Sequence, residues 1–146
     1  MSAGELRVQR LDPAARLPVR AHDDDAGYDL CALDRCTLRP GERAVIRTGV
    51  AIELAPANAG LILPRSGLAA RHGIAIVNAP GLIDSGYRGE LKILLLNTDR
   101  TEPFEIAAGD RIAQLVIVAV ATPEIVEADA LAATLRGEGG FGSSGV

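Results

Sequence analysis

Aromatic residues are scarce in this chain of 146 amino acids, which contains no tryptophan, two tyrosines and two phenylalanines. Its interior must therefore be built from Val, Ile, Leu and Ala. Hydrophobic residues still make up 48% of the chain and charged residues 23%, a balance typical of a protein that folds around a core. The length fits one domain of ordinary size. With so few rings, each one can be examined individually.

A basic surplus is also absent, because 15 Lys and Arg face 19 Asp and Glu and leave a net charge of -4. This balance speaks against a protein that coats DNA or RNA. The longest uncharged stretches, such as residues 112–123, are shorter than the roughly 18 to 20 apolar residues that span a bilayer. The first twenty residues lack the apolar segment of a secretory signal. We therefore expect a soluble, cytoplasmic protein with no polymeric nucleic acid and no membrane as partner.

Cysteine is rare as well. Cys31 and Cys36 lie five positions apart, without a second cysteine pair or a nearby histidine. This spacing argues against a zinc site and, less strongly, against a structural disulfide. We expect two reduced, partly buried thiols.

Helix-forming segments are few, because 16 glycines and 8 prolines divide the chain into short apolar pieces. Hydrophobic runs and alternation predict strands within residues 43–54, 60–63, 74–77, 91–97 and 112–120. Residues 112–120 are apolar on both faces, so we expect another layer or subunit to cover them. A helical turn or two is expected at Ser66–Arg71 and a further turn at Leu131–Leu135. This pattern predicts an all-β, jelly-roll or β-sandwich-like single domain.

Five segments contain glycine and polar residues that strand formation does not explain. They are residues 26–30 (AGYDL), 64–69 (PRSGLA), 81–90 (GLIDSGYRGE), 111–115 (RIAQL) and 136–145 (RGEGGFGSSG).

The second and third segments each allow two interpretations. Arg65, Ser66 and Gly67 supply a guanidinium, a hydroxyl and backbone N–H groups for an anion, but Ser66 could equally be an ordinary helix cap. Asp84, between apolar strands and near glycines, could simply form a turn. It could instead deprotonate a water beside a polyphosphate, with Tyr87 providing a wall for a sugar.

The acidic run that extends into the first segment and the amide of the fourth segment also allow two interpretations each. Four aspartates lie between residues 23 and 29, either as a solvated loop or as carboxylates that hold Mg²⁺ through its retained waters. Gln114 is polar within the most apolar segment, where an unpaired amide is costly. It must pair with backbone or with a ligand.

The C-terminal segment has five glycines in the nine residues 137–145 and cannot bury enough surface to order itself. One interpretation is a frayed terminus. The other is a loop that closes over phosphates, with charge from Arg136 and hydroxyl donors from Ser143 and Ser144. Phe141 favours the second interpretation, because stacking on a base would give this isolated ring a function.

Taken in this order, the five segments resemble the five motifs of the trimeric dUTPases, the deoxyuridine triphosphate nucleotidohydrolases. The resemblance runs from residue 26 to 145, about four-fifths of the chain. It implies a distorted jelly roll of the β-clip type over residues 1–136, assembled as a homotrimer with active sites shared between subunits. Residues 137–146 would be a flexible lid over a neighbouring subunit's site. The implied reaction converts dUTP and water to dUMP and pyrophosphate with Mg²⁺, which keeps uracil out of DNA and supplies dUMP for dTMP synthesis.

The resemblance also implies roles for individual residues. Asp84 would activate the water that attacks the α-phosphorus, Asp29 would hold Mg²⁺ through water, and Tyr87 would lie beneath the deoxyribose. The other implied substrate-binding residues are Arg65, Ser66, Gly67, Gln114, Arg136, Gly142 and Ser143 for the phosphates, Asn78, Gly81, Leu82, Ile83 and Phe141 for uracil, and Lys92 at the pocket wall.

Two other functions deserve comparison. A dCTP deaminase resembles the same fold, but it would need a glutamate placed for deamination and usually has a longer chain. A non-catalytic nucleotide-binding or signalling trimer would not need both Asp29 and Asp84. The segments therefore favour dUTP hydrolysis.

Overall fold

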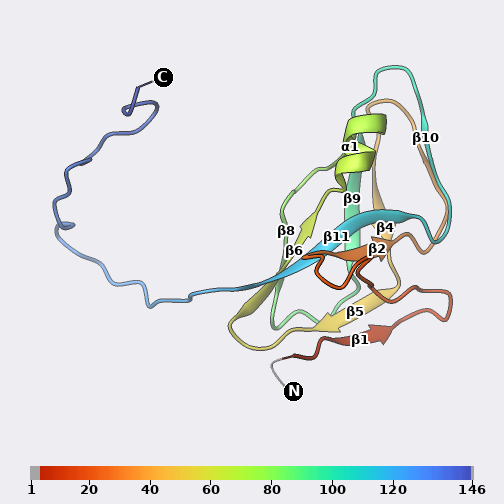
Figure 1. The fold of residues 1–146 in the computed structure, drawn as a ribbon, viewed down its shortest axis with the longest axis horizontal. Helices are drawn as coiled ribbons and strands as arrows, with labels where there is room; N and C mark the ends of the chain where they lie inside the picture. The colour runs from red at the N-terminus through yellow and green to blue at the C-terminus, as the bar shows by residue number, and fades with distance from the viewer. Residues whose placement is uncertain (1–3, 146) are drawn as a thin grey trace.

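The computed structural model describes residues 4–145, which form eleven short strands and one helix (Figure 1). In chain order the elements are β1 (Arg7–Arg10), β2 (Tyr28–Cys31), β3 (Cys36–Leu38), β4 (Arg43–Arg47), β5 (Val50–Glu53), β6 (Asn58–Leu63), α1 (Ser66–His72), β7 (Ile74–Ile76), β8 (Gly81–Asp84), β9 (Lys92–Asn97), β10 (Phe104–Ile106) and β11 (Arg111–Ala119). The strands pair antiparallel in four sheets, of which the largest have the orders β2-β11-β6-β8 and β4-β9-β7, while β1 pairs with β5 and β10 with β3. The all-β, jelly-roll prediction is confirmed.

The predicted strand over residues 43–54 is in fact two strands, β4 and β5. The chain turns between them at Thr48 and Gly49, and Gly49 has a φ of 72°, a conformation that side chains with a Cβ rarely adopt. A Cβ at Gly49 would also lie 2.8 Å from the side chain of Ala15. Turn geometry and close packing both require glycine here.

The core is aliphatic, as the composition predicts. On β9 and just before it, Leu91, Ile93 and Leu95 are at most 1% exposed, which confirms their predicted alternation. Full burial of such a side chain contributes about 1.5 to 3 kcal/mol each. Phe104 lies half-buried in β10 against this core.

β11 is buried only over its first half. Ile112, Ala113 and Leu115 are buried, whereas Val116 to Val118 are half-buried. Within one chain, therefore, only the first half of residues 112–120 is covered as expected. The second half keeps exposed apolar surface.

Asp84 ends β8 and is also the first residue of the turn that follows, because its carbonyl accepts the N–H of Tyr87 at 3.0 Å. One alternative interpretation and one expectation from the sequence are wrong. Ser66 is not the cap of α1, because Arg65 is the N-cap residue and makes no side-chain capping hydrogen bond. Residues 131–135 do not form a helical turn, and they are exposed; with no apolar face buried, so short a segment has nothing to stabilise it.

Beyond β11 the chain leaves the folded body as an extended arm (Figure 1). Residues 121–145 are exposed apart from Gly139. The arm therefore begins well before Arg136, where we expected the domain to end, and residue 146 of the predicted lid lies outside the described residues.

Both cysteines are free, in agreement with the predicted reduced state, and burial raises the pKa of the Cys31 thiol. Within residues 4–145, the structure contains no helix with the length and apolar character needed to cross a membrane.

Candidate functional site

Three of the five sequence segments meet at one end of the largest sheet. The register sets Gln114 of β11 opposite Asp29 of β2 on one side and Leu63 of β6 on the other. Immediately after β6 the chain passes through Pro64 and Arg65 into α1. The result is a cavity of about 450 Å³, lined by Ala21, Asp25, Ala26, Gly27, Asp29, Leu63, Arg65, Ser66, Gly67, Gln114 and Val116.

The charge at this cavity is arranged around Asp29. Its carboxylate oxygens lie 3.4 Å from Nε of Arg65 and 3.6 Å from Nη1 of Arg111, and its side chain is only 14% exposed. Arg65 also donates a hydrogen bond from Nη1 to the carbonyl of Arg111, at 3.3 Å. One carboxylate therefore contacts two guanidiniums, whose remaining N–H groups are suited to bind an anion such as phosphate.

Arg111 has no role in the sequence-based assignment, although it opens the fourth segment. Its position beside Asp29 depends on the pairing of β11 with β2, where the register shifts between Arg111 and Ala113. The sequence shows an arginine at the start of an apolar strand, which could have marked Arg111 as a candidate, but it does not indicate that Asp29 is its partner.

The side-chain amide of Gln114 forms a hydrogen bond with the backbone, because its Nε2 donates to the carbonyl of Pro64 at 2.9 Å. Its Oε1 faces Gly27, where an added Cβ would lie only 2.5 Å from that oxygen. A side chain at position 27 would therefore displace the end of Gln114, which ties the chain before α1 to β11.

The third segment lies elsewhere on the sheet. β8 pairs with β6 so that Gly81 faces Ile62 and Asp84 faces Ala59. Asp84 is therefore beside the start of β6, whereas Arg65 follows its end. At about 3.3 Å per residue, four residues along β6 correspond to about 13 Å.

The predicted uracil-reading residues lie around β8. Gly81 is buried, and a Cβ there would lie 3.3 Å from Cβ of Ile62 and 3.6 Å from Nδ2 of Asn78. Leu82 is 63% exposed and Ile83 half-buried. A side chain at position 81 would press on Ile62 of β6, so glycine permits the close approach of β8 to β6.

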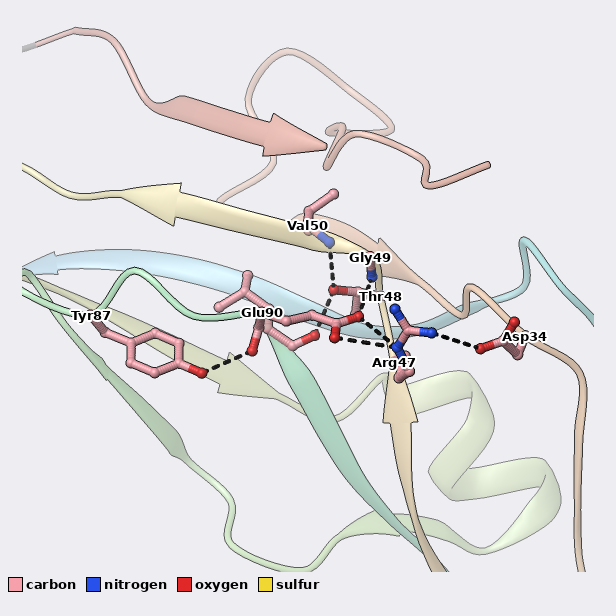
Figure 2. A network of polar contacts seen from close by, with 8 residues as sticks. Asp34, Arg47, Thr48, Gly49, Val50, Tyr87 and Glu90 are labelled. Carbon is pink, nitrogen blue, oxygen red and sulfur yellow. Dashed lines mark hydrogen bonds and ion pairs between the residues drawn. The ribbon is translucent and has the colours of Figure 1, made fainter. Parts of the chain in front are cut away.

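Tyr87 follows Asp84 closely and is held by its own loop. Its backbone N–H donates to the carbonyl of Asp84 at 3.0 Å, and its hydroxyl donates to the carbonyl of Glu90, also at 3.0 Å (Figure 2). The side chain of Lys92 is exposed on β9, opposite Arg47 of β4. The exposed Asp84 carboxylate and the Tyr87 ring thus belong to one short segment.

The C-terminal candidates remain on the arm. Arg136 donates from Nε to the carbonyl of Gly139 at 2.8 Å, and the backbone N–H of Ser143 donates to Gly140 at 3.1 Å. Phe141 is fully exposed, and Gly142 has a φ of 87°. The described chain does not bring these four residues to the cavity.

A magnesium ion fits this donor set in a limited way. Residues 4–145 contain no cluster of three or more His, Cys, Asp or Glu that could enclose a metal. Mg²⁺, however, usually keeps several waters and needs only one or two carboxylates together with substrate phosphates. Asp29, which lines the cavity together with Arg65, matches that requirement.

Comparison with known proteins identifies the relatives of this chain. The family model dUTPase matches residues 14–145. A deoxyuridine 5'-triphosphate nucleotidohydrolase from Thermobifida fusca is 55% identical over 140 residues, covering 96% of this chain and 78% of the relative. The protein of the same name from Mycolicibacterium gilvum is 54% identical over 145 residues, covering 96% and 94%.

Solved structures give the same result. The dUTPase of Staphylococcus bacteriophage 80alpha with dUPNHPP has a TM-score of 0.93 and 36% identity, covering 99% of this chain and 100% of that one. A mutant dUTPase of the S. aureus phage phi11, described for its coordination of a structural Mg(II) ion, has a TM-score of 0.83 and 32% identity, covering 88% and 99%.

Proposed function

This chain belongs to the dUTPase family and is a dUTP diphosphatase, and we propose that it acts through a water molecule activated by Asp84. The water attacks the α-phosphorus of dUTP: an O–P bond forms, the bond to the bridging oxygen breaks, and pyrophosphate leaves. Asp84 accepts the proton of the water. The observation that supports this assignment best is an exposed carboxylate three residues before Tyr87, at the opposite end of β6 from the cavity that contains Arg65.

The phosphates are bound by the cavity residues. Arg65 supplies a guanidinium, Ser66 a hydroxyl and Gly67 a backbone N–H, and Gln114 completes this wall. Asp29 would hold Mg²⁺ through water, and that ion, when bound, neutralises charge on the triphosphate.

The nucleoside is bound by the β8 segment. Asn78 and the backbone from Gly81 through Leu82 and Ile83 read the uracil edge, where a close fit excludes the thymine methyl group. Tyr87 lies beneath the deoxyribose and leaves no room for a ribose hydroxyl, and Lys92 lines the outer wall.

A complete site requires more than one copy of the chain. Asp84 and Arg65 lie at opposite ends of β6, the second half of β11 keeps apolar surface, and the arm extends away from the body. We infer a cytoplasmic homotrimer in which neighbouring subunits share each site. Its activity would keep uracil out of DNA and supply dUMP for dTMP synthesis.

The C-terminal lid completes the proposed site. Residues 137–146 of one subunit would close over a neighbour's nucleotide, with Phe141 stacked on uracil. Arg136, Gly142 and Ser143 would bind phosphate oxygens. A chain truncated after Arg136 should fold and assemble as the full chain does, yet lose most of its turnover; full activity of the truncated protein would contradict the lid.

The decisive test is Asp84→Asn, which keeps the size of the side chain and removes its basicity. We expect dUTP affinity to change by a few-fold and kcat to fall by about 10² to 10⁴, the usual contribution of a general base. Asp23→Asn, in the exposed acidic loop, is the matched control and should keep normal turnover. Near-normal kcat for Asp84→Asn would refute the assignment.

A nucleotide panel defines the substrate. Pyrophosphate release from dUTP, dTTP, dCTP and UTP is measured with Mg²⁺ and with a chelator, and ammonia release from dCTP is followed in parallel. We expect activity on dUTP alone that the chelator suppresses. Ammonia from dCTP would instead indicate a deaminase.

A further inference from the structure

Glu90 occupies the junction between the loop after β8 and the start of β9, and nothing described above gives its side chain a function. The carboxylate turns toward the β4–β5 turn, where Oε1 accepts the backbone N–H of Gly49 at 2.9 Å. Both oxygens accept Nε of Arg47, at 3.2 and 3.3 Å (Figure 2). The Glu90 side chain is only 12% exposed, whereas that of Arg47 is 48% exposed, so the carboxylate is shielded from water on the side of the fold.

The same turn also forms hydrogen bonds with the next residue along the chain, Leu91. Thr48 donates from its hydroxyl to the carbonyl of Leu91 at 2.6 Å, and the N–H of Leu91 donates to the carbonyl of Val50 at 2.8 Å. Glu90 and Leu91 are therefore attached to a buried part of the fold by side-chain and backbone bonds together. Residues at the centre of such a network have little freedom to move.

The Tyr87 hydroxyl donates a hydrogen bond to the carbonyl of Glu90 in this anchored segment, at 3.0 Å. Within residues 4–145 this is the only hydrogen bond of that hydroxyl. Tyr87 is 43% exposed, so burial alone does not define where its ring lies. Gly89 contributes space, because a Cβ there would collide with the ring. The ring's position thus depends on where the Glu90 backbone is held.

We propose that Glu90 is a positioning residue for Tyr87: its carboxylate, bound by Arg47 and the Gly49 N–H, fixes the carbonyl that holds the ring and thereby sets the selection of deoxyribose over ribose. This inference rests on the proposed role of Tyr87 as the sugar-binding wall. A shift of the ring would admit a 2′-hydroxyl, so the expected effect is on substrate selection.

The test compares kcat/KM for dUTP with that for UTP in three variants. Glu90→Gln keeps an acceptor for Gly49 but loses the charge facing Arg47, and Tyr87→Phe keeps the ring but loses the hydroxyl. We expect each to lower the dUTP/UTP ratio about fivefold to tenfold, the effect of one hydrogen bond. The double variant should show no further decrease, because both changes act through the same contact.

Glu105→Gln is the matched control, since Glu105 also accepts a side-chain hydrogen bond, from Thr37 at 2.8 Å, but on the β3–β10 pair. It should leave the ratio unchanged. A Glu90→Gln protein that is merely less stable to heat, with a normal ratio, would overturn the proposal, as would additive effects in the double variant.

Tyr87→Phe keeps the proposal testable even if Glu90→Gln does not fold. An unchanged ratio in Tyr87→Phe would show that the hydroxyl bond does not set selection, and the proposal would fail. If wild-type protein did not prefer dUTP to UTP at all, the sugar-wall role itself would be wrong, which separates the two failures.

Discussion

Thr48→Val separates hydrogen bonding from hydrophobicity at a buried position. Thr48 is 1% exposed, and its hydroxyl donates to the Leu91 carbonyl at 2.6 Å and accepts the Val50 N–H at 3.4 Å. Valine has nearly the same shape, so no cavity is created. A scale of hydrophobicity alone would predict a more stable protein.

The hydrogen bonds predict the opposite sign. Valine leaves the buried Leu91 carbonyl without its hydroxyl donor, and an unsatisfied buried group costs about 1 to 3 kcal/mol. For a chain of this size, about 2 kcal/mol corresponds to a decrease in Tm of about 4 to 8 °C. Thr48→Ser keeps the hydroxyl and removes one methyl group, at a cost of about 1 kcal/mol.

The assay is urea unfolding of wild type, Thr48→Val and Thr48→Ser at one protein concentration, because assembly makes apparent stability depend on concentration. The expected order of stability is wild type, then Thr48→Ser, then Thr48→Val. A valine variant at least as stable as the serine variant would refute the hydrogen-bond account.

Gly27→Ala places a Cβ 2.5 Å from Oε1 of Gln114 and so displaces the amide that donates to Pro64. We expect KM for dUTP to rise about fivefold, the effect of one lost hydrogen bond, as measured by steady-state kinetics on the folded variant. Backbone N–H groups lower the pKa of Asp99, so its stabilisation is present above the unfolded-state pKa and lost as pH falls through the lower folded value. The free energies of unfolding of wild type and Asp99→Asn should therefore differ near pH 6 and become equal below the folded-state pKa of Asp99. Iodoacetamide should alkylate Cys36 before the more buried Cys31, as mass spectrometry of the native protein would detect.

Strands with a regular aliphatic pattern were predictable, and short mixed strands were not. The alternation of Leu91, Ile93 and Leu95 indicates β9 directly. By contrast, β3 and β10 have three residues each, and their pairing joins segments far apart in the chain, with Thr37 opposite Glu105. No local pattern of that length distinguishes a strand from a loop.

The sequence by itself determined which chemical groups are available and in what order: the glycine-flanked Asp84, the Arg65-Ser66-Gly67 loop, the polar Gln114 and the glycine-rich tail. Those are properties of residue type and local spacing. They were sufficient to predict the fold class and the family.

Tertiary structure alone decided which of these groups meet. Antiparallel register brings Arg111 to Asp29 and sets Asp84 at the opposite end of β6 from Arg65, and the β4–β5 turn holds Glu90 through Arg47. Each contact joins residues from distant parts of the chain, so its existence depends on the packing of the whole domain. Local sequence encodes the side chains, whereas the fold determines the distances between them.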